Sequence, residues 1–177
     1  HDVESRGLGD VYKRQEKGVD LHVEVINRFE SDFMNTLEEG AAFLEKVNHA
    51  HVKLLVDTFH MNIEEDNMFA SIKKYISKIG CIHISENHRG VPGTGHIDWK
   101  QLMATLEDVG YDGYLEMETF TEAGTEVAKG MGIWRQIGKE TPLDEAKKGI
   151  RFLKNNEMRR YRNESIYYHG KETCRSI

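Results

Sequence analysis

The sequence predicts an α/β protein with a parallel sheet, on the basis of three observations. Short runs rich in β-branched residues alternate with amphipathic stretches of helix length. Four such strand-then-helix units follow one another, and parallel neighbouring strands require crossovers that helices supply. Each strand-like run also carries an ionisable residue near its carboxyl end, which suggests a site shared by several strands.

The first two units contain two strands and two helices. LHVEVIN at 21–27 has the composition of a strand. The next helix starts at Asn35 or Thr36, either of which can act as its N-cap. HVKLLVDTF at 51–59 predicts the second strand, and apolar residues at helical spacing predict a helix over 67–78.

The remaining units begin with a third strand, IGCIHIS at 79–85. A glycine-rich loop follows at 89–95, and Asp98 is the expected cap of a helix that reaches Val109. YDGYLEMETF at 111–120 predicts the fourth strand. One or two further helices are expected, at roughly 125–137 and 143–156.

Composition and charge argue against several classes of protein. Thirty acidic and 24 basic residues give a net charge of −6, so a nucleic-acid partner is not expected. The two cysteines, Cys81 and Cys174, form no C-x-x-C pair or disulfide framework, which favours a reducing, cytoplasmic location. No apolar run approaches the ~20 residues that span a bilayer, so no membrane association is expected.

The ionisable residues near the strand ends form the candidate site. A strand buried on both faces should be almost continuously apolar, so these exceptions need an explanation. Side chains alternate between the faces of a strand, and all four can face one interior. An oxygen-rich set with one imidazole suits Mn²⁺, Co²⁺ or Mg²⁺. The alternative is that each is a hydrogen-bonded polar group at a strand end, but four equivalent positions favour a metal site. The residues are Glu24, Asp57, His83 and Glu118.

Four longer segments carry a resemblance to a known family. They are VEVINRFE at 23–30, VDTFHMNIEED at 56–66, HISENHRGVPGTGHIDW at 83–99 and GYDGYLEMETF at 110–120. In these segments the chain resembles the D-tagatose 3-epimerase and D-psicose (D-allulose) 3-epimerase family, within the xylose-isomerase-like barrels. The resemblance runs from about residue 19 to 155, with the four ionisable residues separated by 33, 26 and 35 positions as in that family.

The resemblance implies a metal-dependent ketose 3-epimerase that inverts C3 through a metal-stabilised enediolate. The implied ion is Mn²⁺ or Co²⁺, with Mg²⁺ also compatible, and its implied ligands are Glu24, Asp57, His83 and Glu118. The first and last of these are also the implied acid and base, without a decision about which is which. The implied sugar contacts are Glu30, His60 and Arg89. Relatives of this kind are usually dimers or tetramers, so a homo-oligomer is expected for the full-length protein.

The resemblance also implies a domain organisation. A complete (β/α)₈ barrel needs ~250 residues, so this chain of 177 corresponds to strands five to eight with their helices. We expect the half barrel to occupy 16–157, a leader that resembles adapter sequence or is disordered to occupy 1–15, and a polar, disorder-prone tail to occupy 158–177. Two residues depart from the family pattern: Thr119 stands where proline is usual, and Glu116 where an aliphatic residue is usual.

Several functional alternatives remain open. An aldose–ketose isomerase, a hydroxypyruvate isomerase or an inosose dehydratase could use a similar set of ligands. A barrel endonuclease would need more histidines and a basic surface, which the net charge of −6 disfavours. A half barrel with unpaired strand edges could also be a non-catalytic fragment.

Overall fold

The computed structural model describes residues 19–155. The leader expected at 1–15 and the tail expected at 158–177 lie outside the described residues. Within the described part, no helix has the length and apolar character needed to cross a membrane.

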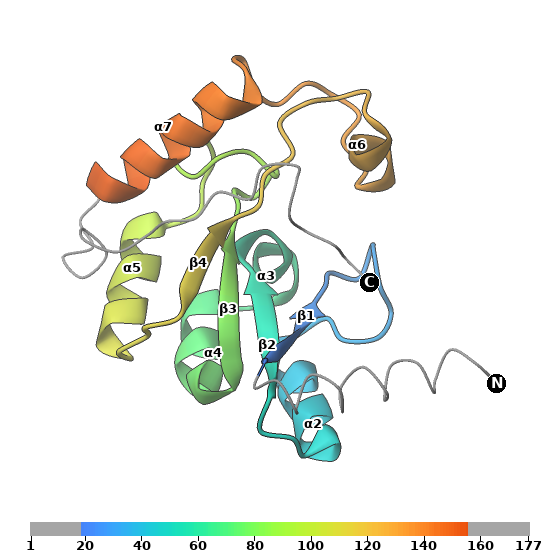
Figure 1. Cartoon of the computed structure of the whole chain (residues 1–177), viewed down its shortest axis with the longest axis vertical. Coiled ribbons are helices and arrows are strands. Elements are labelled where there is room, and N and C mark those ends of the chain that lie inside the picture. The colour runs from blue at the N-terminus through green and yellow to red at the C-terminus, as the bar shows by residue number, and fades with distance from the viewer. Residues whose placement is uncertain (1–18, 156–177) are drawn as a thin grey trace.

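Four parallel strands form one sheet in the order in which they occur along the chain (Figure 1). Each strand pairs in parallel with the next, which confirms the predicted α/β class and parallel sheet. The strands are β1 (Leu21–Val25), β2 (Val52–Asp57), β3 (Ile79–Ile84) and β4 (Tyr114–Met117).

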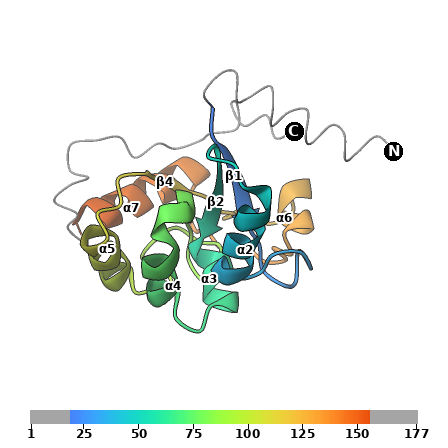
Figure 2. The same ribbon diagram turned by 90° about the horizontal axis from the view of Figure 1, so that it is seen from below.

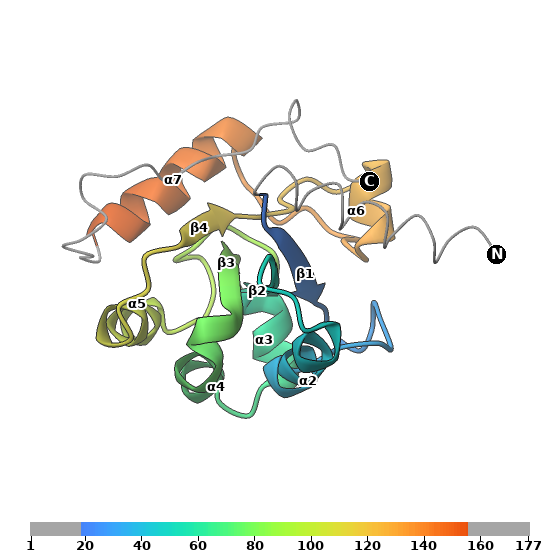
Figure 3. The same cartoon turned by 60° about the horizontal axis from the view of Figure 1, so that its bottom comes forward.

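Three of the helices lie along one face of the sheet, as the turned views show (Figures 2 and 3). These are α2 (Leu37–Val47), α4 (Met68–Tyr75) and α5 (Trp99–Asp108). Two others lie beyond the carboxyl end of β4, at the top of Figure 1: α6 (Glu126–Gly130) and α7 (Pro142–Asn155). The short α3 (Thr58–Glu64) follows β2 directly, and a 3₁₀ turn, η1 (Ile76–Lys78), follows α4.

Local side-chain caps explain where α2 and α5 begin. Thr36 Oγ1 accepts a hydrogen bond from the Glu39 amide at 3.3 Å, and Glu39 Oε2 accepts one from the Thr36 amide at 3.1 Å. This capping box satisfies two amides that the helix itself leaves unpaired. Asp98 Oδ1 caps α5 by accepting a hydrogen bond from the Gln101 amide at 2.9 Å. Of the two candidate caps at Asn35 and Thr36, Thr36 is the one used, and the predicted cap at Asp98 is confirmed.

The second strand is shorter than predicted because its last residue starts a helix. The sequence suggested a strand through 51–59, but β2 ends at Asp57 and α3 begins at Thr58. The Asp57 carboxylate accepts a hydrogen bond from the Phe59 amide at 2.7 Å, as an N-cap does. The predicted strand was too long because Phe59 is apolar and continues the strand-like sequence pattern beyond Asp57.

Other boundaries differ at the element ends. Of the helix predicted at 125–137, only α6 forms, and the prediction is wrong for the residues after it. Gly132 adopts a left-handed φ of 68°, which an α-helix cannot continue through. The helix expected at 67–78 becomes α4 followed by η1. The remaining predicted strands, 21–27, 79–85 and 111–120, shorten to β1, β3 and β4.

The two faces of the sheet have different chemistry. The helix-covered face holds the apolar core, in which four strand side chains are fully buried: Leu54, Val56, Ile82 and Ile84. The alternate residues of the same strands point to the other face, which carries carboxylates, an imidazole and a thiol. This second face is where the candidate site lies.

Candidate metal centre

The structure brings the four strand-end residues together. Ligand atoms of Glu24, Asp57, His83 and Glu118 all lie within 4.8 Å of one another. Three of these residues belong to β1, β2 and β3, and the fourth directly follows β4. Parallel strands present their carboxyl ends at one edge of a sheet, so residues far apart in sequence converge there.

His83 has a different environment at each ring nitrogen. Nδ1 lies 4.0 Å from Glu24 Oε1 and 3.7 Å from Glu118 Oε2. It is buried and has no hydrogen-bond partner among residues 19–155. Burial disfavours the imidazolium form, but the surrounding carboxylates, led by Glu118, outweigh it and raise the pKa of His83 to about 9.

Arg89 is the cation that lies among the carboxylates. Its side chain is 1% exposed, with Nη1 2.6 Å from Asp57 Oδ2 and 3.0 Å from Glu118 Oε2. Nη2 lies 3.0 Å from His60 Nε2, and the guanidinium lies 4.1 Å from the centre of the Phe59 ring. Arg89 therefore compensates charge on two of the four candidate ligands.

The backbone holds Arg89 in an uncommon conformation. Its φ of 66° is left-handed, which costs free energy in a residue other than glycine. The loop around it is built on buried Glu86, whose Oε1 accepts hydrogen bonds from Trp99 Nε1 at 2.6 Å and from the Gly93 amide at 2.7 Å. Nothing in the sequence pattern singled out Glu86, yet it shapes the loop that positions Arg89.

The pKa values of the three carboxylates do not all shift in the same direction. Burial raises the pKa of Glu24, and the nearby Glu118 charge raises it further. Complete burial raises the pKa of Asp57 to about 7, against the lowering effect of Arg89. Burial acts the same way on Glu118, but His83 and Arg89 outweigh it and lower the pKa of Glu118 to about 2. When carboxylates are crowded into one buried site, their pKa values commonly move apart in this way.

His60 and Glu30 are linked through a residue that sequence reasoning missed. The Asn27 side-chain nitrogen lies 2.7 Å from His60 Nδ1 and donates to Glu30 Oε1 at 2.8 Å. Burial, together with the charge of Arg89, lowers the pKa of His60 to about 4, so its ring is neutral at pH 7. Buried Asn27 follows β1 by two residues, and this strand-end position was the signal that could have identified it.

The three predicted sugar contacts lie at different depths. Arg89 and His60 are buried beside the four candidate ligands, and His60 Nε2 is 3.7 Å from Glu24 Oε1. Glu30 is exposed and is connected to them by the Asn27 amide. A pocket opens next to the cluster, lined in part by His83, Glu118, Phe120, Val127 and Leu143.

The residues present fit a divalent cation. Three carboxylates and an imidazole supply hard oxygen donors and one nitrogen, a set typical of Mn²⁺ or Mg²⁺ sites. The buried His83 Nδ1, without a hydrogen-bond partner in residues 19–155, points a ring nitrogen into this set. A bound cation would occupy this nitrogen and offset the charge of the carboxylates.

The known proteins to which this chain is similar include several sugar 3-epimerases. A D-psicose 3-epimerase of Ruminiclostridium cellulolyticum is 44% identical over 120 residues, which cover 68% of this chain and 41% of the relative. An L-ribulose 3-epimerase of a Methylomonas species is 37% identical over 141 residues, covering 78% of this chain and 49% of the relative. This chain thus spans less than half the length of these curated relatives.

A solved structure agrees with this result. The crystal structure of D-psicose 3-epimerase with D-tagatose from Clostridium cellulolyticum H10 has a TM-score of 0.77 and 39% identity, over 85% of this chain and 54% of that one. The sequence pattern of the family described as xylose isomerase-like TIM barrel matches residues 6–156. With most of its length matched by that pattern, and with the same parallel α/β arrangement, this chain belongs to the xylose isomerase-like TIM barrel family.

Proposed function

We propose that this chain is the C-terminal half, strands five to eight, of a metal-dependent ketose 3-epimerase. The observation that carries the proposal is the convergence of Glu24, Asp57, His83 and Glu118 within 4.8 Å at the carboxyl edge of the sheet. Relatives named D-psicose 3-epimerase and L-ribulose 3-epimerase, 44% and 37% identical, support a ketose as the substrate class. The four-stranded sheet, with β1 and β4 at its edges, supports the half-barrel assignment.

The four ligands would hold one divalent cation, Mn²⁺ or Co²⁺. When bound, the cation supplies Lewis-acid stabilisation of negative charge that develops on the sugar oxygens. Glu24 lies on β1 and Glu118 directly follows β4, the two edge strands of the sheet, and both reach the shared site. One of them removes the C3 proton and the other returns a proton to the opposite face, which inverts the carbon.

The neighbouring residues would bind and orient the ketose. Arg89 presents a buried cation to hydroxyl or carbonyl oxygens, and neutral His60 presents a ring nitrogen beside it. Glu30 would hold His60 in place through Asn27, because the amide contacts both side chains. Because these groups hold one end of the sugar in a fixed place, they would place its C3 atom between the two glutamates.

The test is an assay of product formation by the protein that carries the whole barrel. With Mn²⁺ or Co²⁺ present, D-fructose, D-psicose and D-tagatose should be converted to ketoses inverted at C3. An aldose as the product would instead identify an aldose–ketose isomerase, and loss of water would identify a dehydratase. The 177-residue chain assayed in parallel distinguishes a working enzyme from a non-catalytic fragment.

A further inference from the structure

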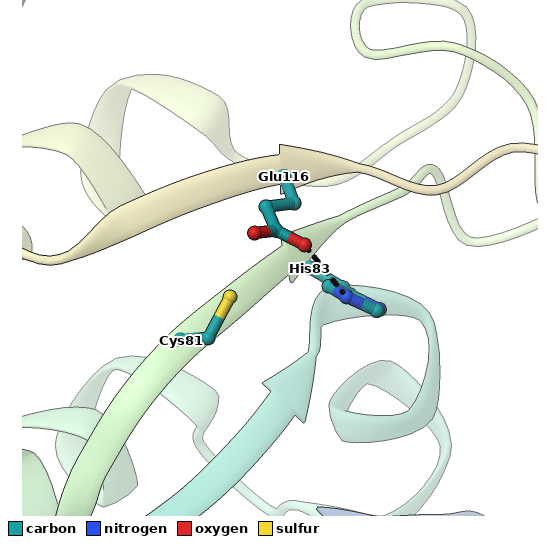
Figure 4. Close-up of side chains that lie close together, drawn as sticks. All are labelled: Cys81, His83 and Glu116. Atoms are coloured by element: carbon teal, nitrogen blue, oxygen red, sulfur yellow. Dashed lines mark ion pairs between the residues drawn. The ribbon is translucent and has the colours of Figure 1, made fainter. Parts of the chain in front are cut away.

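Glu116 is a carboxylate on the same face of the sheet as the four candidate ligands. The strand register places Glu116 directly beside His83, with Asp57 on the other side of His83. Glu116 Oε2 lies 3.5 Å from His83 Nε2, and the close-up shows the two side chains facing each other (Figure 4). Glu116 stands where the related family usually has an aliphatic residue, so the 3-epimerase resemblance assigns it no role.

The two nitrogens of the His83 ring face two different groups of carboxylates. Nδ1 faces Glu24 and Glu118, at 4.0 and 3.7 Å. Nε2 faces Glu116 at 3.5 Å. A histidine binds a cation only in its neutral form, which carries one N–H and one lone pair, and a carboxylate beside Nε2 stabilises the neutral tautomer whose proton is on Nε2. The lone pair is then on Nδ1, toward the candidate metal ligands.

We propose that Glu116 is a positioning residue that fixes the His83 ring and its tautomer so that Nδ1 binds the cation. The inference rests on the metal site of the proposed function and adds a carboxylate–histidine–metal arrangement to it. Metal-bound histidines commonly donate their second N–H to a carboxylate, and loss of that partner weakens metal binding. Glu116 does not touch the substrate in this proposal.

The same side chains suggest a second arrangement that the geometry favours less. Cys81, His83 and Glu116 also offer ligand atoms within 4.8 Å of one another (Figure 4). A cation held there would need the lone pair of His83 Nε2. A neutral ring has only one lone pair, so His83 cannot serve this cation and the four-ligand site together without losing both protons.

Mn²⁺ affinity of the 177-residue chain and its variants tests the proposal, with free Mn²⁺ measured by electron paramagnetic resonance. Glu116→Val should weaken binding by about 10- to 100-fold, the usual effect of losing such a partner. Glu116→Gln keeps an oxygen acceptor for the Nε2 proton and should retain most of the affinity. Cys81→Ala is the matched control and should bind as the wild type does.

The outcomes separate this inference from the proposed function. If Glu116→Val binds Mn²⁺ as tightly as the wild type does, the proposed role of Glu116 is overturned, but the proposed metal site is not. A loss in Cys81→Ala as large as in Glu116→Val also overturns it, in favour of a cation at Cys81. Absence of Mn²⁺ binding by the wild type overturns both proposals.

A second measurement requires no substitution. In Mg²⁺-loaded wild-type protein labelled with ¹⁵N, the ring signals of His83 should show a protonated Nε2 and an unprotonated Nδ1. A purely structural role of Glu116 would leave the tautomer undetermined. Protonation at Nδ1 in the loaded protein contradicts the proposal regardless of how the variants fold.

Discussion

Arg89 and Asp57 form a buried ion pair at the centre of the candidate site. Their side chains are 1% and 0% exposed, and Nη1 lies 2.6 Å from Oδ2. A buried charge without a partner is strongly unfavourable, so each of these groups depends on the other or on a substitute ion. A divalent cation bound by Asp57 would be such a substitute.

Arg89→Ala should therefore destabilise the protein mainly when no metal is present. Without Arg89, the buried Asp57 must either stay charged without a partner or take up a proton, which should lower the free energy of unfolding by about 3–5 kcal/mol in the presence of a chelator. Saturating Mn²⁺ should recover much of this loss, because the cation replaces the lost positive charge. Urea unfolding with and without Mn²⁺ measures both quantities.

The control is Lys73→Ala, which removes an exposed lysine that pairs with the exposed Asp108 at 2.9 Å. Exposed pairs contribute about 0–1 kcal/mol, and Mn²⁺ should not change this value. If Arg89→Ala lowers the free energy of unfolding equally with and without Mn²⁺, the link between Arg89 and the metal site is contradicted. In the complete enzyme, the same substitution should mainly raise KM, because Arg89 is proposed to bind the sugar.

In the protein that carries the whole barrel, Glu118→Gln should separate catalysis from folding. The amide preserves the size of the side chain but can neither accept nor return the C3 proton, so kcat should fall by at least about 100-fold, the lower range for a general acid or base. Circular dichroism should show an unchanged fold. Turnover at the wild-type rate would remove Glu118 from the chemistry.

At the scale of the elements, α7 packs closely against the loop that follows β3 and against β4. A Cβ placed on Gly149 would lie 2.7 Å from Met117 Sδ, 3.2 Å from Pro92 Cδ and 3.3 Å from Val91 Cβ. Glycine is therefore needed for the close approach of this helix. The contact connects α7 to the end of β4, next to Glu118.

Gly149→Val should reduce the free energy of unfolding by about 1–3 kcal/mol, since the larger side chain overpacks this contact. Gly130→Ala in α6 is the control, because a Cβ there meets nothing within 4 Å. It should be neutral or stabilise by about 0.4–1 kcal/mol through the unfolded state. Equal effects of the two substitutions in urea unfolding would show that α7 does not pack as described.

At the scale of the whole molecule, the sheet has two edges and one polar face. In the described part of the chain, β1 pairs with β2 and β4 with β3, so each outer strand has one partner. In a closed (β/α)₈ barrel both edges would be paired and the polar face would be enclosed. Unpaired edges of this kind promote association with another chain.

The purified 177-residue chain should therefore self-associate, or bind a separately produced N-terminal half. Sedimentation should show species larger than a monomer, and adding the N-terminal half should replace them with one defined complex. A stable, active monomer would contradict the half-barrel assignment. The measurement is independent of the metal, which can be present or absent.

The sequence by itself determined the order of strands and helices, the parallel sheet, and the strand-end residues that converge. Alternation of apolar runs and the two-residue period of strands depend on local chemistry, which a sequence displays directly. Glu24, Asp57, His83 and Glu118 could be identified for this reason.

Only the tertiary structure decided which side chains touch. The pairing of Arg89 with Asp57, the link of Asn27 to His60, and the position of Glu116 beside Nε2 of His83 depend on strand register and loop conformation. These arise from contacts between residues roughly 30 positions apart, which no local pattern encodes. The end of β2 was likewise decided by the Asp57 cap, because one carboxylate both starts α3 and contacts Arg89.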